Sequence, residues 1–273
     1  MPTRKNVQHS QASKIHERTN AQFGAAAAAY SSSLTHSDPD ALNRVVELAG
    51  PKPEDVVLDV ATGAGHTALA LAPHVREVIA YDMTEPMLAE TRRNAAIRGL
   101  TNVLTRQGTA EELPFPDASF DIVTVRQAPH HYADVRTAIR EMARVVKLGG
   151  RVIVIDSVSP DDDFLDGQWN RLEKLRDPSH IRNYRANEWR EFVTDAGLRI
   201  VFEELGFATE KNGPMEFAAW IRRMNTPPAA VTEITRSFRE ASPSLTAALR
   251  IQVIDGAIYF CVPQITVVSI RDR

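Results

Sequence analysis

Two acidic residues and a pair of glycines near the start of the chain could hold a small charged ligand. Asp59 ends an apolar run, and Gly63 and Gly65 follow it in the stretch VLDVATGAGHTALALA (57–72). A glycine-rich turn between a strand and a helix leaves room for a ligand at the helix N-terminus. Asp82 ends the next apolar run. An acid at that place binds ribose hydroxyls in folds with a parallel sheet.

The charge of Asp59 indicates which nucleoside fits. The stretch GAGHTA (63–68) matches the dinucleotide pattern G-x-G-x-x-[GA]. A carboxylate before those glycines would repel a pyrophosphate, but it suits an ammonium group, directly or through water. The turn that begins at Gly108 can present backbone groups to an aromatic base. An ammonium group, a diol and a purine edge together describe S-adenosylmethionine better than NAD.

Histidines form the second group that could do chemistry. His130 and His131 follow the apolar stretch 119–125, where we expect the reacting atoms to lie. A histidine can take a proton from an oxygen or carbon nucleophile at neutral pH. The alternative is that one histidine packs under a lid and the other bonds a backbone carbonyl. His180 and Asp177 in LRDPSH are further candidates, although Asp-Pro-Ser is also ordinary turn chemistry.

The other polar residues are weaker candidates for a functional role than the histidines. Arg176 could orient an acidic substrate, or it could be a packing residue. Asp134 and the acids 161–163 could supply metal ligands, but a helix start and a solvated loop explain them more simply. We therefore expect no metal. The single cysteine, Cys261, excludes an internal disulfide and any site with several thiolates.

Alternating strand-like and helix-like segments must position these residues. Strands are expected at 56–61, 78–82, 102–107, 119–125 and 151–156, with helices between them. The strands are apolar almost throughout, which predicts a parallel sheet covered on both faces. Ligands in such a sheet bind at the carboxyl ends of the strands. Asp59, Asp82 and the histidine pair all lie at such ends.

The flanking regions have their own patterns. A helix is expected over 38–50, with Asp38 as its N-cap and Gly50 as its stop. After Asp156 we expect a long connection, a helix at 188–197, a strand at 199–207, helices within 213–250 and a last strand at 257–270. The predicted organisation is an N-terminal arm with a helical alanine run (1–36), a cofactor-binding core (37–206), a helical lid (207–257) and a last core strand (258–273).

Composition and charge indicate which classes of binding partner and which cellular location to expect. The net charge is −3, which gives no electrostatic reason to expect nucleic acid or an anionic membrane. The first 20 residues are polar and resemble no secretory signal, and a transit peptide is the weaker alternative. We expect a cytoplasmic protein, as a monomer or homodimer, with no nucleic-acid or membrane partner.

Four stretches carry a family resemblance: VLDVATGAGHTALALA, VIAYDMTEPML, GTAEELPFPDASFDIVTVR and EMARVVKLGGRVIVID. They resemble the motifs of class I S-adenosylmethionine-dependent methyltransferases, and most of all the ubiquinone/menaquinone-methyltransferase-like group. APHHYADV and LRDPSH are similar to a bacterial subgroup. The resemblance implies a Rossmann-like sheet of seven strands, mostly parallel with the last strand antiparallel, and a helical lid insert.

The resemblance also implies roles for single residues. Asp59, Gly63 and Gly65 would cradle the methionine part, Asp82 would hold the ribose, and Met83 would pack on adenine. Thr109 stands where many relatives have an acid, and its hydroxyl can still hydrogen-bond the adenine. The residues expected at the cofactor are Tyr30, Asp59, Thr62, Gly63, Gly65, Asp82, Met83, Thr109, Ala110, Glu111, Arg126 and Gln127. The residues expected to be catalytic are His130, His131 and His180.

The predicted activity is methyl transfer to the oxygen or carbon of a small molecule, with nitrogen possible. Cytosine C5 transfer needs a cysteine near the cofactor, and Cys261 lies in a terminal strand. Transfer to the adenine amine goes with an Asn/Asp-Pro-Pro-aromatic turn, and this chain has RQAPHHY at that place, so neither subtype is expected.

The acceptor pocket is expected between the ends of the fourth and fifth strands, LRDPSH and the helical insert. A nicotinamide-dependent oxidoreductase and a non-catalytic cofactor sensor are the alternatives. Three tryptophans of the late region could line the acceptor pocket: Trp169, Trp189 and Trp220.

Overall fold

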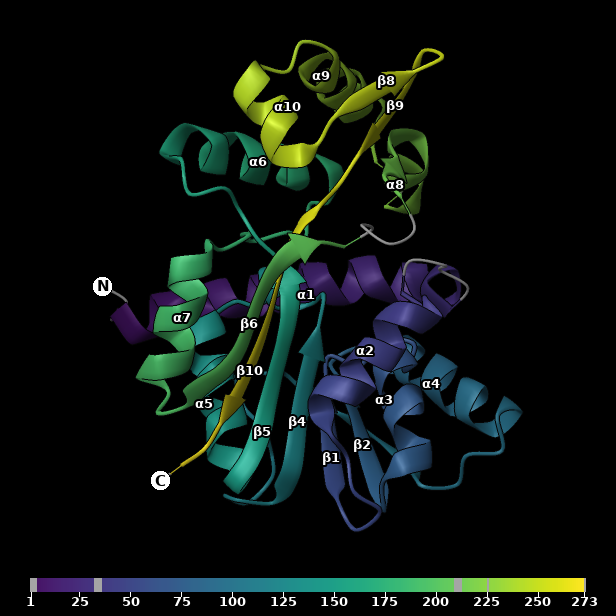
Figure 1. Cartoon of the computed structure of the whole chain (residues 1–273), viewed down its shortest axis with the longest axis vertical. Coiled ribbons are helices and arrows are strands. Elements are labelled where there is room, and N and C mark those ends of the chain that lie inside the picture. The colour runs from purple at the N-terminus through teal and green to yellow at the C-terminus, as the bar shows by residue number, and fades with distance from the viewer. Residues whose placement is uncertain (1–3, 32–35, 209–212, 225, 273) are drawn as a thin grey trace.

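A seven-stranded sheet forms the core of the computed structural model, which describes residues 4–31, 36–208, 213–224 and 226–272 (Figure 1). The strand order is β3-β2-β1-β4-β5-β10-β6. Strands β1 to β5 are parallel, whereas β10 lies antiparallel between β5 and β6. The predicted fold class is thus confirmed. The strands are β1 (Val56–Val60), β2 (Glu77–Asp82), β3 (Val103–Gln107), β4 (Phe120–Arg126), β5 (Val146–Ser157), β6 (Arg199–Phe207) and β10 (Pro263–Ile270).

Helices cover both faces of this sheet. On one face α2 (Pro39–Ala49) and α3 (His66–Leu71) pack on apolar side chains of β1, β2, β4 and β5. On the other face α5 (Val135–Val145) and α7 (Ala186–Asp195) do the same. Helix α4 (Glu85–Ile97) runs beside α3 along β2 and β3, and two short 3-10 turns, η1 (Ala72–His74) and η2 (Pro129–His131), complete the core.

The predicted capping of α2 is confirmed. The Asp38 side chain accepts hydrogen bonds from the backbone N–H groups of Asp40 and Ala41, and Gly50 ends the helix with a φ of +54°. Each cap satisfies backbone groups that a helix end leaves without an internal partner. The signals in the sequence therefore fixed both ends of this helix.

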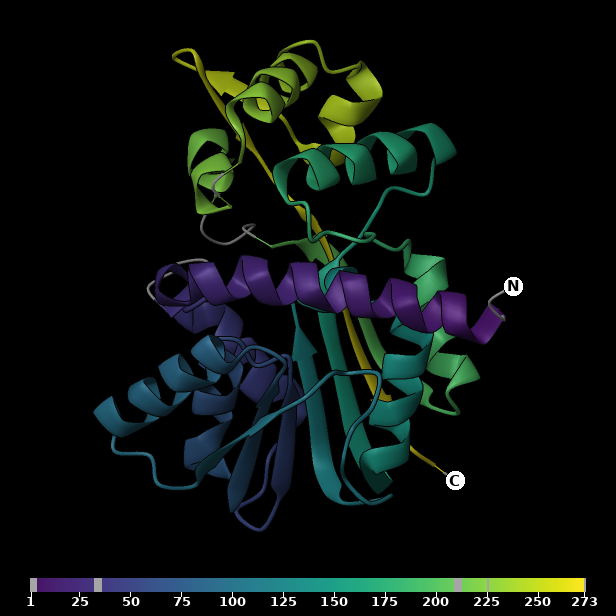
Figure 2. The same ribbon diagram turned by 180° about the vertical axis from the view of Figure 1, so that it is seen from behind.

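One long helix, α1 (Arg4–Ser31), lies across the carboxyl ends of the strands (Figure 2). The alanine run was expected to be helical, and the structure continues that helix back to Arg4. Helix α1 packs against α4 at one end of its path. It therefore separates the sheet from the part of the molecule above it.

A smaller layer, which we call the cap, stands over α1 and the strand ends (Figure 1). Its own apolar cluster includes Trp169, Trp220, Phe238 and Phe260, with the two indoles stacked at 6.0 Å. The cap consists of α6 (Asp163–Arg176), α8 (Phe217–Arg223), α9 (Pro228–Arg239), α10 (Pro243–Leu249) and the small sheet of β7 (Met215–Glu216), β9 (Ala257–Phe260) and β8 (Gln252–Ile254).

Three predicted elements differ from the structure. The long connection after Asp156 contains α6, whose N-cap Asp162 accepts from the backbone N–H groups of Phe164 and Leu165. The expected last strand is two strands, because β9 pairs in the cap and only β10 joins the core. The fifth strand was expected to begin at residue 151, but α5 ends at Val145 and passes directly into β5, which begins at Val146.

The division into arm, core, lid and last strand stays a prediction. Within the residues that the structure describes, no helix has both the length and the apolar character needed to cross a membrane.

Candidate functional site

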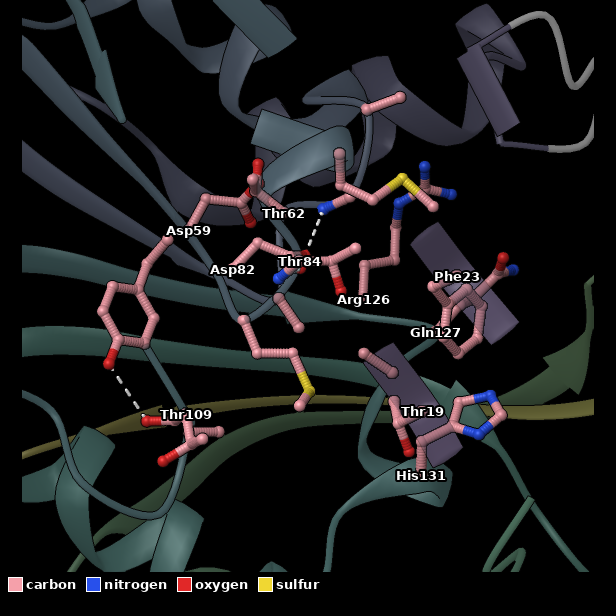
Figure 3. A pocket seen from close by; sticks show the side chains of 18 of the residues that line it. Thr19, Phe23, Asp59, Thr62, Asp82, Thr84, Thr109, Arg126, Gln127 and His131 are labelled. Carbon is pink, nitrogen blue, oxygen red and sulfur yellow. Dashed lines mark hydrogen bonds between the residues drawn. The ribbon is translucent and has the colours of Figure 1, made fainter. Parts of the chain in front are cut away.

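A cavity lies at the carboxyl ends of β1, β2 and β4, under α1 (Figure 3). We call it the first cavity. All but one of the residues expected at the cofactor line it: Tyr30, Asp59, Thr62, Gly63, Asp82, Met83, Thr109, Ala110, Glu111, Arg126 and Gln127. Gly65 is the exception. Its φ is +88° and a Cβ there would lie 2.8 Å from the Thr91 side chain, so its role is to permit the turn.

The Asp59 carboxylate organises the glycine loop from below. It accepts hydrogen bonds from Thr62 Oγ1 at 2.6 Å, Thr124 Oγ1 at 2.7 Å and the Ala68 N–H at 3.1 Å. An ionised carboxylate has about four acceptor positions, so roughly one remains for a ligand. Burial raises the pKa of Asp59 to about 6. The group is therefore still mainly ionised at neutral pH, and its charge reaches the cavity.

Asp82 connects the end of β2 to the same loop. Its Oδ2 accepts from the Gly63 N–H and its Oδ1 from the Thr84 N–H, both at 2.8 Å. Gly63 has a φ of +57°, and a Cβ there would meet no atom within 4 Å, so the loop is open on that side. The loop thus presents a glycine backbone and a carboxylate to the same space.

Tyr81 fixes the turn that follows β3. Its hydroxyl donates to the Thr109 carbonyl at 3.1 Å and lies near the Glu112 carbonyl at 3.2 Å. A Cβ on Gly108 would lie 1.9 Å from that hydroxyl, so only glycine allows the contact. The backbone of Thr109 and Ala110 is held at the cavity in this way, as a base-binding turn requires.

Helix α1 adds three residues to the predicted Tyr30: the sequence did not indicate His16, Thr19 or Phe23 as cavity residues. His16, Thr19, Phe23 and Tyr30 line the cavity, and their spacing places them on one side of the helix. His16 Nε2 lies 3.3 Å from Glu111 Oε2. Interaction with the Glu111 carboxylate, which accepts from the imidazole N–H, raises the pKa of His16. This pair joins α1 to the turn after β3.

The C-terminal end of α1 has a second anchor. His66 Nε2 lies 3.0 Å from the Tyr30 carbonyl, and Asn94 Nδ2 donates to Ser31 Oγ at 3.0 Å. Tyr30 itself lies edge-on to Phe23 with ring centroids 5.5 Å apart, and burial raises its pKa to about 12. Helix α1, the roof of the first cavity, is thus held near its middle by His16 and at its C-terminal end by Tyr30 and Ser31.

Apart from His16 Nε2, whose one polar contact is the pair with Glu111, three buried polar atoms in this lining have no hydrogen-bond partner among the described residues. They are Thr19 Oγ1, His66 Nδ1 and Tyr132 Oη. Leaving such an atom unsatisfied costs roughly 1–3 kcal/mol. A polar ligand in the cavity would satisfy them, and so the lining fits a molecule with several donors and acceptors.

A second cavity adjoins the first, between the strand ends and the cap. Four residues line both: Tyr30, His36, Gln127 and His131. Its other walls come from α6, β7, α8 and the segment before β10. This is the place where the sequence predicts the acceptor. Gln127 has a φ of +53°, a strained conformation for a residue with a side chain.

His130 and Asp156 form a pair at the floor of the second cavity. His130 Nδ1 lies 2.6 Å from Asp156 Oδ1, and the His130 N–H donates to Asp156 Oδ2 at 2.9 Å. Burial lowers the pKa of His130, but the charge and hydrogen bond of Asp156 outweigh it, so the pKa lies above its ordinary value. The engaged Nδ1 leaves Nε2 as the nitrogen that can exchange a proton with a ligand.

His131 lines both cavities and so lies at their junction. Figure 3 shows its ring in the lining of the first. Its ring packs edge-on to Phe23 at 4.8 Å, and its Nδ1 lies 3.3 Å from Ser179 Oγ. Burial, and then the charge of His130, lower its pKa to about 3. His131 is therefore neutral at pH 7 and a much weaker base than His130.

His180 lines neither cavity. Its ring is 1% exposed, and its Nε2 lies 3.1 Å from Asn170 Oδ1. Burial lowers its pKa, and so do the nearby histidines. The structure thus places this predicted catalytic residue behind His130, with ring centroids 5.6 Å apart.

Asp177 does line the second cavity. Its Oδ1 accepts from the Ser179 N–H and hydroxyl, while its Oδ2 is buried without a hydrogen-bond partner, 3.8 Å from His131 Nε2. Of the three tryptophans, Trp220 lines this cavity, Trp169 packs behind it, and Trp189 lies on the opposite side in the core.

Comparison with known proteins identifies the family. Residues 58–154 match a model described as a methyltransferase domain. The chain is 36% identical to the uncharacterized methyltransferase YcgJ of Bacillus subtilis over 251 residues, which cover 91% of this chain and 97% of that protein. The chain belongs to this methyltransferase family. Like its relatives in fold, it is a class I enzyme that depends on S-adenosylmethionine.

Other relatives agree with this assignment. The methyltransferase superimposes on the crystal structure of YcgJ with a TM-score of 0.79 and 37% identity, over 86% of this chain and 99% of the other. It is 40% identical to the uncharacterized protein YafE of Escherichia coli over 69% of this chain and 88% of that protein. It is 35% identical to the ubiquinone/menaquinone biosynthesis C-methyltransferase UbiE of Teredinibacter turnerae over 60% and 71%. The predicted family, fold and cofactor are confirmed.

Proposed function

We propose that the first cavity binds S-adenosylmethionine and the second binds a small-molecule acceptor, which is methylated at oxygen or carbon. The observation that carries this proposal is the junction: the two cavities share a wall at Tyr30, Gln127 and His131. The two cavities therefore adjoin at these residues, and the proposal places the reacting atoms of both ligands there. Methyl transfer needs direct contact between the ligands, because the nucleophile, the methyl carbon and the sulfur must be in line.

The residues of the first cavity fit the cofactor. Asp59 supplies a negative charge near the glycine loop, for an ammonium group. Asp82 has acceptor positions left beside Gly63, for ribose hydroxyls. The Thr109 and Ala110 backbone faces the side expected for adenine, and Met83 lies in the same lining. The unpartnered Thr19 and Tyr132 hydroxyls are consistent with a polar occupant.

When bound, S-adenosylmethionine supplies a methyl group whose carbon–sulfur bond breaks towards sulfur, so the products are S-adenosylhomocysteine and the methylated acceptor. His130 accepts the proton of the acceptor at Nε2. Asp156 positions the ring through Nδ1 and stabilises the imidazolium that forms. His131 stays neutral and shapes the junction. Helix α1 and the cap exclude water from both ligands.

The experiment is release of S-adenosylhomocysteine across a panel of phenols, enols and hydroxy acids. The His130→Ala variant should lose turnover and keep cofactor binding, whereas His74→Ala, at an exposed histidine, should retain both. Cofactor binding without turnover on any acceptor would favour the sensor alternative. Stabilisation by NAD and not by S-adenosylmethionine would contradict the roles given to Asp59 and Asp82.

A further inference from the structure

Arg126 lines the first cavity at the end of β4 (Figure 3). Its side chain is partly buried, and its Nε donates to Thr67 Oγ1 at 3.1 Å while its Nη2 donates to the His36 carbonyl at 2.5 Å. Both acceptors are neutral oxygens. A guanidinium has five N–H donors, and the two on Nη1 have no partner among the described residues, so they remain for a ligand.

Among the described residues, no carboxylate forms an ion pair with the Arg126 guanidinium. Burial lowers the pKa of Arg126, and the charges of Asp59 and Asp38 offset part of that effect through space. Arginine nevertheless stays protonated in proteins. Burial, and in addition the charge of Arg126, lower the pKa values of His36 and His66. These imidazoles are therefore neutral at pH 7, and Arg126 supplies the positive charge of this wall.

The other carboxylates in the lining of the first cavity are engaged elsewhere. Asp82 is bonded to the glycine loop, and Glu111 pairs with His16 of α1. Neither acts on the pKa of Arg126, so Asp59 is the acid of the first cavity that does.

Asp59 and Arg126 belong to neighbouring parallel strands, β1 and β4, at their carboxyl ends. The start of α3 is bound to both, because the Thr67 hydroxyl accepts from Arg126 and the Ala68 N–H donates to Asp59. Each of the two charges shifts the pKa of the other group in the direction of mutual attraction. The lining therefore holds an acid and a base beside the glycine loop. An α-amino acid, which carries an ammonium group and a carboxylate on one carbon atom, matches both.

We infer that Arg126 binds the carboxylate of the methionine end of S-adenosylmethionine, while Asp59 attracts its ammonium group. The inference rests on the proposed function, because it concerns the occupant of the first cavity. A hydrogen bond between a guanidinium and a carboxylate is charge-assisted and roughly twice as strong as a neutral one. The protein thereby selects sulfonium nucleosides that carry both charges, and it binds poorly those that have lost the carboxylate.

Decarboxylated S-adenosylmethionine tests this directly, because it keeps the adenosine, the sulfonium and the ammonium group and lacks only the carboxylate. Calorimetry without an acceptor measures the Kd of both nucleosides. For the wild type, the Kd of the decarboxylated nucleoside should be about 10- to 100-fold higher than that of S-adenosylmethionine, as the loss of a hydrogen bond between charged groups predicts.

Variants of Arg126 then assign the preference. Arg126→Gln should raise the Kd of S-adenosylmethionine about 10- to 100-fold and leave that of the decarboxylated nucleoside within about twofold. Arg126→Lys keeps the charge without the planar guanidinium, so it should show a smaller preference than the wild type, and it decides the question if Arg126→Gln does not fold. Arg140→Gln removes the same charge from the exposed side of α5 and should bind both nucleosides like the wild type.

Failure of the inference is distinguishable from failure of the proposed function. A wild type that binds both nucleosides equally overturns the inference. Equal losses of affinity for both nucleosides in Arg126→Gln, as a purely structural role would cause, overturn it as well, and so does an unchanged preference in Arg126→Gln or Arg126→Lys. A wild type that binds neither nucleoside contradicts the proposed function instead.

Discussion

The two cavities lie side by side, but the chain builds them in different ways. Except for its roof and His36, the first cavity is lined by residues 59–132, where successive strands end and turn. The second takes residues from 30 to 264, contributed by α1, η2, β5, α6, β7, α8, β10 and the segments between elements. The first is a local motif repeated at several strand ends, and the second exists only after the cap has folded over the sheet.

The comparison also separates two kinds of polar group. In the first cavity, the Asp59 and Asp82 carboxylates accept hydrogen bonds mainly from backbone N–H groups and threonine hydroxyls. These bonds fix the shape of the glycine loop that a ligand would contact. In the second cavity, His130 and Arg176 are each held by a single carboxylate, from Asp156 and Glu173. We therefore expect changes in the first cavity to alter binding and changes in the second to alter turnover.

Replacing His130 should cause the largest loss of turnover and the clearest difference between turnover and cofactor binding. His130→Ala removes the proposed base and should lower kcat roughly 10²- to 10⁴-fold, the range typical of general-base catalysis. Its Kd for S-adenosylmethionine should change less than about twofold, because His130 lines only the second cavity. Steady-state kinetics with calorimetry measure both quantities. A kcat equal to that of the wild type would remove His130 from the mechanism.

Asp82→Ala should show the opposite pattern. Loss of the carboxylate removes the bonds to Gly63 and Thr84 and the proposed ribose contact, so the cofactor Kd should rise about 10- to 100-fold. The exposed acid Asp161 offers a matched control, and Asp161→Ala should bind like the wild type. If calorimetry gave the same cofactor Kd for both variants, the assignment of the first cavity to the cofactor would be wrong.

The sequence predicted the first cavity well because its signals are local. Asp59, Gly63 and Asp82 end or follow short apolar runs, and strand ends meet at one edge of a parallel sheet. The floor of the second cavity was only partly predicted. His130 and Asp156 are 26 positions apart, and their pairing depends on β4 and β5 being neighbours.

Other misses have identifiable signals. Helix α6 has an N-cap acid, Asp162, and buried residues at 165, 169 and 172, which is a helical spacing. The segment was nevertheless expected to be a connection without regular structure. The face of α1 at the cavity is polar and aromatic rather than apolar, so no periodicity marked it. The catalytic role of His180 stays a prediction that rests on the conspicuous LRDPSH stretch; in the structure its ring contacts Asn170 and lines neither cavity.

Asp156→Asn should change the pH dependence more than the cofactor affinity. A base works in its neutral form, so kcat should rise as pH increases through the raised pKa of His130. Without the Asp156 charge, burial dominates and that pKa falls, so the rising limb should move to lower pH. The maximal kcat should also fall, because the ring loses its orientation. A limb at the same pH in wild type and Asp156→Asn would contradict the pairing.

The smallest effect is expected at the roof of the first cavity. The pKa of His16 is raised by Glu111, so the pair is complete below the ordinary pKa of histidine and is lost as pH rises through the raised value. Because the pair is partly exposed, the cofactor off-rate should rise by no more than about fivefold over that interval. Stopped-flow measurements should find no such rise in His16→Gln. If the cofactor off-rate of His16→Gln still rose over this pH interval, a group other than His16 would be responsible for the titration.

The most direct test of the account is a crystal structure of the protein with S-adenosylhomocysteine. We predict the amino-acid end beside Asp59 and Gly63, the ribose at Asp82, the adenine at Thr109 and Ala110, and the sulfur directed towards the junction at His131. A nucleoside bound in the second cavity, or one whose sulfur points away from His130 and His131, would contradict it.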